Sequence, residues 1–148
     1  MTSSVDPTIE IAAVKARLDA LTGNTYEGIP QGTKLDVDGF GAKAAYRDFE
    51  PGSVTPGGSG RIVGAGPQSQ PHIWAFQVHH YGSTRKEATD LAIETDVSLI
   101  GFEPSSNAGP ISPFFFQVYD NMAKNGERVG WIATRFYETE LGQNPDLT

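Results

Sequence analysis

The spacing of apolar residues predicts an amphipathic helix close to the start of the chain. Asp6 can cap this helix, Pro7 suits its first turn, and Gly23 supplies a stop. The apolar positions that recur at helical spacing, and so share one face, are Ile11, Val14, Leu18 and Leu21. One side of this helix is therefore expected to pack on a core.

A second helix is predicted in the segment STRKEATDLAIETDVSLIG, which begins at Ser83. Thr84 and Glu87 stand at the spacing of a capping box. The residues that fall on its apolar stripe are Ala88, Leu91, Ala92, Thr95 and Leu99. The residues that fall on its polar face are Lys86, Asp90, Glu94 and Ser98. We expect the polar face to meet solvent or a neighbouring subunit.

Alternating apolar and polar positions predict four strands. The four segments are AKAAYRDFE (42–50), HIWAFQVHHYG (72–82), FFFQVYDN (114–121) and RVGWIATRFYETE (128–140). The first is expected to end at Pro51, and the second has both faces partly covered, as in a central strand. Asn125-Gly126 is a strong hairpin signal between the last two. Residues 24–41 are turn-rich, with only a short possible strand around Leu35.

This element order predicts a single α+β domain over residues 1–148. We expect a mainly antiparallel sheet of about four strands, with two helices packed on it and a long β-hairpin loop. That loop, PGSVTPGGSGRIVGAGPQSQP (51–71), contains one charged residue, Arg61. In the run of three phenylalanines, Phe114 and Phe116 are expected in the core and Phe115 is expected to point outward.

Composition narrows the function classes. Eleven basic and eighteen acidic residues give a formal charge of −7, which argues against a protein that mainly grips nucleic acid. The absence of cysteine excludes disulfides, thiolate metal sites and a cysteine nucleophile. The N-terminus lacks the pattern of a signal peptide, and no apolar run reaches the ~20 residues of a membrane span. We expect a soluble protein with no membrane partner.

No nucleotide or metal site is expected from the motifs. The glycine-rich stretch 51–71 joins two strands and does not open into a helix, so it does not form a phosphate cradle. His79 and His80 are neighbours on a strand and point to opposite faces, so they cannot chelate one ion. Asp36 and Asp38 resemble a calcium loop only over three residues, and a turn explains them.

No catalytic group stands out either. The serines lie outside a nucleophile-elbow motif. Asp48 and Glu50 share one face of a strand, but charges at a strand end are usually just solvated. We therefore expect no enzyme activity, no catalytic residue and no cofactor.

The order of elements and several segments resemble the tail terminator proteins of long-tailed bacteriophages, especially those of actinobacterial hosts. The segments that carry the resemblance are VKARLDAL, YRDFEPGSVTPGG, HIWAFQVHHYGSTRKEATDLA and GERVGWIATRFYETEL. Together they extend over nearly the whole chain. The likeness rests on pattern and order, since the family has no catalytic motif to match.

The resemblance implies an α+β subunit that forms a hexameric ring on the tail tube, stops tube polymerisation and offers its other face to the head connector. Its implied partners are other copies of the chain, the tail tube protein and the head-tail connector or a head-completion protein. DNA would pass through the lumen without specific binding. The implied location is the neck of the virion, after assembly in the host cytoplasm.

Two regions are our candidates for these contacts. The long loop is expected to bind an axial or lateral partner through Gly57, Gly58, Arg61 and Ile62. The polar face of the second helix is expected either to be solvated or to form inter-subunit ion pairs through Lys86, Asp90 and Glu94.

Two alternatives remain open on the sequence alone. One alternative to the terminator is another neck component, such as a head-completion or minor tail protein. A small-molecule-binding or enzymatic α+β domain would instead need a concave pocket, which we would place near Trp74, His80 and Tyr137.

Overall fold

A computed structural model describes residues 6–27, 45–56, 72–122 and 128–142. The elements are α1 (Thr8–Asp19), β1 (Asn24–Glu27), β2 (Tyr46–Pro56), β3 (His72–Gly82), α2 (Arg85–Leu99), β4 (Ser112–Met122) and β5 (Arg128–Leu141). The strands form one sheet in the order β1-β2-β3-β5-β4. Only the β1–β2 pair is parallel. The predicted α+β class is confirmed, with five strands in the sheet rather than four.

The additional strand is β1, which pairs in parallel with β2 so that Tyr26 lies opposite Asp48. The four residues of β1 are too few to show a period of two in the sequence, and this is why the segment resembled a turn. The possible strand around Leu35 lies outside the described residues.

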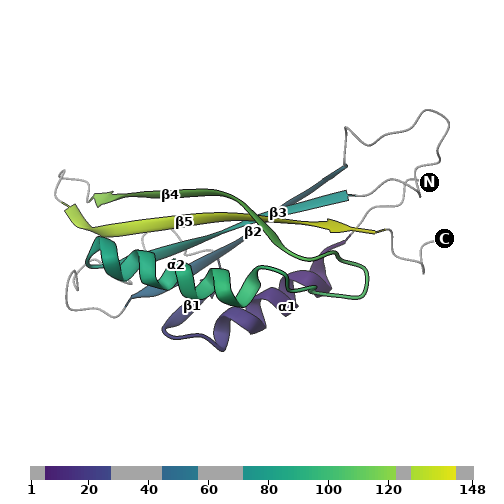
Figure 1. The fold of residues 1–148 in the computed structure, drawn as a ribbon, viewed down its shortest axis with the longest axis horizontal. Helices are drawn as coiled ribbons and strands as arrows, with labels where there is room; N and C mark the ends of the chain where they lie inside the picture. The colour runs from purple at the N-terminus through teal and green to yellow at the C-terminus, as the bar shows by residue number, and fades with distance from the viewer. Residues whose placement is uncertain (1–5, 28–44, 57–71, 123–127, 143–148) are drawn as a thin grey trace.

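Both helices cover the same face of the sheet (Figure 1). The predicted stripe of α2 is confirmed, since all five of its members are buried. In α1, Val14 and Leu18 are buried, while Ile11 and Leu21, which follows the helix, are partly buried against the core. The strand residues that complete the main core under the helices include Phe49, Trp74, Phe76, Val78, Tyr137 and Leu141.

The predicted capping box of α2 is confirmed, whereas α1 differs from the prediction: Pro7 is its N-cap residue rather than part of its first turn, and the helix ends at Asp19, before Gly23. The Thr84 hydroxyl accepts a hydrogen bond from the Glu87 amide at 3.1 Å, and the Glu87 carboxylate accepts one from the Ser83 amide at 2.7 Å. The Asp6 carboxylate accepts from the amide of Thr8, the first residue of α1, at 3.0 Å. Neither of these described helices is long and apolar enough to cross a membrane.

The expectation that the strand after residue 45 ends at Pro51 is wrong. β2 continues to Pro56, and its pairing with β3 shifts register between Glu50 and Ser53. A β-bulge accommodates Pro51, which has no amide hydrogen to give to the ladder. The Pro51 carbonyl accepts a hydrogen bond from the Trp74 indole at 2.6 Å, so the bulge is tied to the core.

Phe114 and Phe116 depart from the expectation that they lie in the core, whereas Phe115 is exposed as expected. Phe114, Phe115 and Phe116 are 51%, 49% and 40% exposed, so none of the three rings is a core residue. They lie on β4, which is at one edge of the sheet and undergoes a register shift at this point against β5. Phe136 on β5 contacts the rings of Phe114 and Phe115 from the side. The outer end of the sheet is therefore strongly aromatic at its surface.

Gly52 provides a test of the bulge. Its φ is +69°, and a Cβ at this position would overlap the Ala75 carbonyl oxygen. We expect Gly52→Ala to lower the free energy of unfolding by about 2–4 kcal/mol in urea denaturation, from the left-handed backbone and the overlap together. The control is Gly101→Ala, where φ is +86° but no atom lies within 4 Å of the new Cβ. Equal losses of unfolding free energy for the two variants would show that the overlap with the Ala75 carbonyl oxygen adds nothing to the cost.

Candidate functional site

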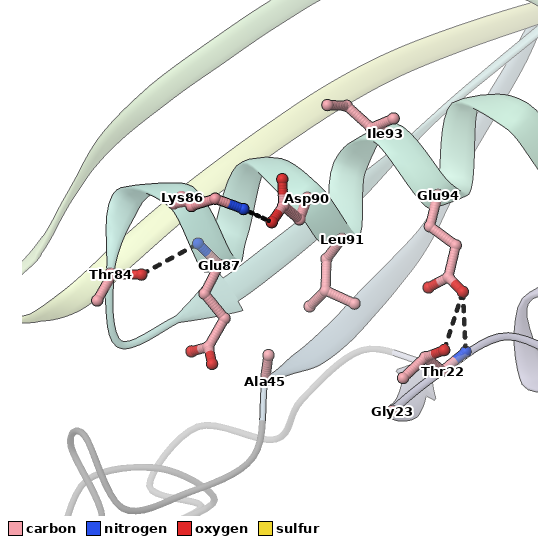
Figure 2. A pocket seen from close by; sticks show the side chains of 10 residues that line it. All are labelled: Thr22, Gly23, Ala45, Thr84, Lys86, Glu87, Asp90, Leu91, Ile93 and Glu94. Atoms are coloured by element: carbon pink, nitrogen blue, oxygen red, sulfur yellow. Dashed lines mark hydrogen bonds and ion pairs between the residues drawn. The ribbon is translucent and has the colours of Figure 1, made fainter.

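The polar face of α2 divides into two parts. The Lys86 ammonium donates to the Asp90 carboxylate at 2.6 Å, and both side chains lie at the surface (Figure 2). Asp90 raises the pKa of Lys86 through this contact. Glu94 instead accepts hydrogen bonds from Arg47 at 2.6 Å and from the Thr22 hydroxyl at 2.9 Å. Burial acts to raise the pKa of Glu94, but these hydrogen bonds lower it overall.

The Glu94 carboxylate is therefore engaged within its own subunit, whereas Lys86 and Asp90 pair on the surface of one helix. A contact between these three residues and a neighbouring subunit stays a prediction. The loop candidates Gly57, Gly58, Arg61 and Ile62 lie outside the described residues, as do the calcium-like Asp36, Asp38 and Gly39.

A cavity of about 910 Å³ lies along this side of α2. Figure 2 shows α2 on one side of it and the turn that contains Thr22 and Gly23 on the other. The cavity is lined by Thr22, Gly23, Ala45, Thr84, Lys86, Glu87, Asp90, Leu91, Ile93 and Glu94. Its volume is in the range of small-molecule sites.

Beneath the cavity, Arg47 holds α2 to the sheet. Its side chain is fully buried although it is charged. The guanidinium donates to the Thr95 hydroxyl at 2.7 Å, to the Thr22 carbonyl at 2.6 Å and to Glu94. A buried charge is tolerated only when such partners satisfy it, so these contacts fix the position of α2 relative to β2.

His80 extends the same network to β5. Its Nδ1 lies 2.7 Å from the Ala133 carbonyl oxygen, and its Nε2 lies 2.7 Å from the Thr95 hydroxyl. Burial lowers the pKa of His80 to about 3, so the ring is neutral at neutral pH. A carbonyl can only accept, so Nδ1 carries the proton and Nε2 accepts from Thr95. Thr95 therefore joins Arg47 to His80.

The alternative enzyme or binding domain was expected to have a pocket near Trp74, His80 and Tyr137, but these three side chains are fully buried among the described residues. Tyr137 donates from its hydroxyl to Asp96 at 2.6 Å, and Asp96 also accepts from Arg135 at 3.0 Å. Burial raises the pKa of Tyr137, so this residue remains a neutral donor. These residues fasten α2 to β5.

The other face of the sheet carries a separate polar cluster. The two adjacent histidines lie on opposite faces, as predicted, and His79 is on the face away from the helices. Its Nε2 lies 3.0 Å from Glu50 Oε1, and its Nδ1 lies 2.7 Å from the Thr134 hydroxyl. Asp48 is directly opposite His79 in the ladder and is only 5% exposed. We name Asp48, Glu50 and His79 the open-face cluster.

The open-face cluster changes the interpretation of its carboxylates. Asp48 and Glu50 were expected to be solvated at a strand end, but β2 continues to Pro56 and places them within the strand. Their proximity to His79 depends on the register of β2 against β3, which the sequence does not state. The sequence did show that Asp48 and Glu50, two residues apart on a strand, point to the same face.

No protein-family model matches this chain, and a search of curated proteins finds no match.

The buried network makes Thr95 a sensitive position. We expect Thr95→Val to lower the free energy of unfolding by about 1–3 kcal/mol in chemical denaturation. Valine has nearly the size of threonine but no hydroxyl, so Arg47 and His80 lose the hydrogen-bond partner that they share. Thr89→Val, a half-buried substitution on the same helix, should change it by no more than about 0.5 kcal/mol. Similar losses of unfolding free energy in the two variants would show that the hydrogen bonds of the Thr95 hydroxyl do not stabilise the fold.

Proposed function

We propose that this chain is a structural subunit of a bacteriophage tail, which forms a hexameric ring at the end of the tail tube. In this role it stops tube polymerisation and joins the tail to the head connector. The proposal starts from the resemblance of four segments to tail terminator proteins. The observation that supports it best in the fold is the exposed aromatic surface of the edge strand β4.

β4 has the properties of a surface that pairs with another chain. It is eleven residues long and bonds to β5 on one side only among the described strands. Natural proteins usually protect a long edge strand with charge, proline or a covering element. β4 has one such residue near its start, Pro113, but beyond it the edge presents three half-exposed phenylalanines and Tyr119. Aromatic residues are enriched at protein interfaces, and apolar residues gathered at an edge favour association.

A closed ring requires two different complementary surfaces on opposite sides of each subunit. The strand order places β4 and β1 at opposite edges of the sheet. On α2, Val97 is 81% exposed and Ile93 is 54% exposed, and these two apolar side chains, one helical turn apart, are our candidates for the second surface. Lys86 and Asp90 lie on the same helix, and they are our candidates for the polar margin of that contact.

The charge of the chain suits a ring through which DNA passes. A net charge of −7 does not favour retention of phosphate backbone, so DNA would move through the lumen without specific binding. The proposed location is accordingly the virion neck, with assembly in the host cytoplasm. The proposal requires no catalytic residue and no membrane partner.

Another neck component, such as a head-completion or minor tail protein, remains the nearest alternative, since it would use the same kind of surface. A small-molecule-binding domain is a second alternative, and the cavity beside α2 is the observation that favours it. It predicts a monomer or dimer and saturable binding of a small ligand beside Glu87 and Asp90. The ring proposal predicts neither.

The test is native mass spectrometry and electron microscopy of the protein with purified tail tubes. We expect an assembly of six times the 15.9 kDa subunit mass, and density at one end of each tube. Tubes polymerised with the protein should be capped, and tubes without it should overgrow. A protein that remains monomeric and leaves the tube ends bare would contradict the proposal.

Phe115→Ser tests the surface that supports the proposal. Because Phe115 is half exposed, the variant should fold normally, but ring formation should weaken by about tenfold or more through loss of an aromatic contact. The matched control is Ile9→Ser, an exposed apolar residue on α1. Equal ring formation by wild type and Phe115→Ser would remove β4 from the interface.

A further inference from the structure

We propose that the open-face cluster, formed by Asp48, Glu50 and His79, is a binding site for a divalent transition-metal ion. The site lies on the sheet face opposite α1 and α2. It does not depend on ring formation, so it can be tested separately from the proposed function.

The three side chains are arranged as a set of metal ligands. Each offers one ligand atom, and these atoms all lie within 4.8 Å of one another. Ligands around a tetrahedral zinc ion, at bond lengths near 2.0–2.1 Å, are separated by about 3.3 Å. His79 Nε2 and Glu50 Oε1 are 3.0 Å apart, so a small outward movement of the Glu50 side chain would admit an ion.

The strand register builds the site. Asp48 lies directly opposite His79, and Glu50 lies opposite Gln77, the residue two positions before His79 on β3. Two carboxylates and one imidazole are therefore held on one face by the ladder itself. Asp48 is almost completely buried, and a divalent cation bound between the two carboxylates would offset the negative charge of both.

Neighbouring groups orient the ligands in the manner of a second coordination sphere. The Thr134 hydroxyl lies 2.7 Å from His79 Nδ1 and can accept a hydrogen bond from it, so Nε2, which faces Glu50 Oε1, is the nitrogen that would bind the metal. The Gln77 amide donates to Glu50 Oε2 at 2.8 Å and leaves Oε1 directed at His79. The Tyr119 hydroxyl lies 3.3 Å from Thr134 and adds a contact from β4.

The ligand types indicate which metal would bind. An imidazole nitrogen favours zinc and the other late first-row ions over magnesium or calcium, and two carboxylates are compatible with zinc. The Glu50 side chain is 43% exposed, so solvent reaches the site and water can complete the coordination. Three protein ligands and one water make a zinc site with an open position.

Zn²⁺ titration of the metal-stripped full chain by calorimetry tests the proposal. We expect one site per chain, and an affinity for Zn²⁺ much higher than for Mg²⁺. His79→Ala should weaken zinc binding by more than about tenfold, and Thr134→Val should weaken it by about 10–100-fold through loss of ring orientation. His72→Ala, which removes a histidine at the far end of β3, should leave the affinity unchanged.

Thermal unfolding gives a second readout that also confirms the folding of each variant. Saturating Zn²⁺ should raise the midpoint of the wild type by several degrees and leave that of His79→Ala unchanged. Asp48→Asn, which preserves shape and removes charge, should respond like His79→Ala. The proposal is overturned if the wild type shows no saturable binding at millimolar Zn²⁺, or if His79→Ala binds Zn²⁺ as tightly as the wild type does.

Discussion

The buried guanidinium of Arg47 is the interaction on which the rest of this structure depends. A charge inside a protein must be met by hydrogen-bond partners, and those of Arg47 come from α2 and from the turn before β1. Thr95 is also hydrogen-bonded to His80, and His80 is hydrogen-bonded to the Ala133 carbonyl of β5. The two helices are thereby fixed on one face of the sheet, and the other face and the β4 edge are left for other contacts.

The two faces of the sheet consequently differ in chemistry. Under the helices the strands contribute large apolar side chains, and the buried Arg47, Thr95 and His80 are hydrogen-bonded to one another. The opposite face carries the open-face cluster and tyrosines from four strands, of which Tyr46 stacks on Tyr81 with ring centroids 4.6 Å apart. This difference between the two faces fits the proposed role of a ring subunit, which would use its uncovered surfaces to bind neighbouring subunits.

The sequence predicted the elements that show a clear period. The α2 stripe and the alternation of β3 followed from residue spacing, and the pairing of β4 with β5 followed from the Asn125-Gly126 turn signal. β1 was missed because four residues carry no period, and the continuation of β2 was missed because a bulge allows Pro51 within a strand. The half-exposed rings of β4 were missed because an apolar run is normally buried, and only the strand order places this run at an edge.

The sites were harder to predict for the same physical reason. The open-face cluster needs the register of β2 on β3, and the engagement of Glu94 with Arg47 needs the helix to be docked. Spacing along one strand shows which residues share a face, as for Asp48 and Glu50, but it does not show which residue on the next strand lies opposite them. The cavity beside α2 likewise forms only when α2 and the turn before β1 are brought together.

The central claim is that the β4 edge is where this subunit meets its neighbours. Amide hydrogen exchange of the free protein and of the protein bound to tail tubes tests it most directly. The account predicts that the amides of β4 exchange more slowly after assembly, while the amides of α2 that are already protected by the core change little. Identical exchange of β4 in the two states, with protection elsewhere, would contradict it.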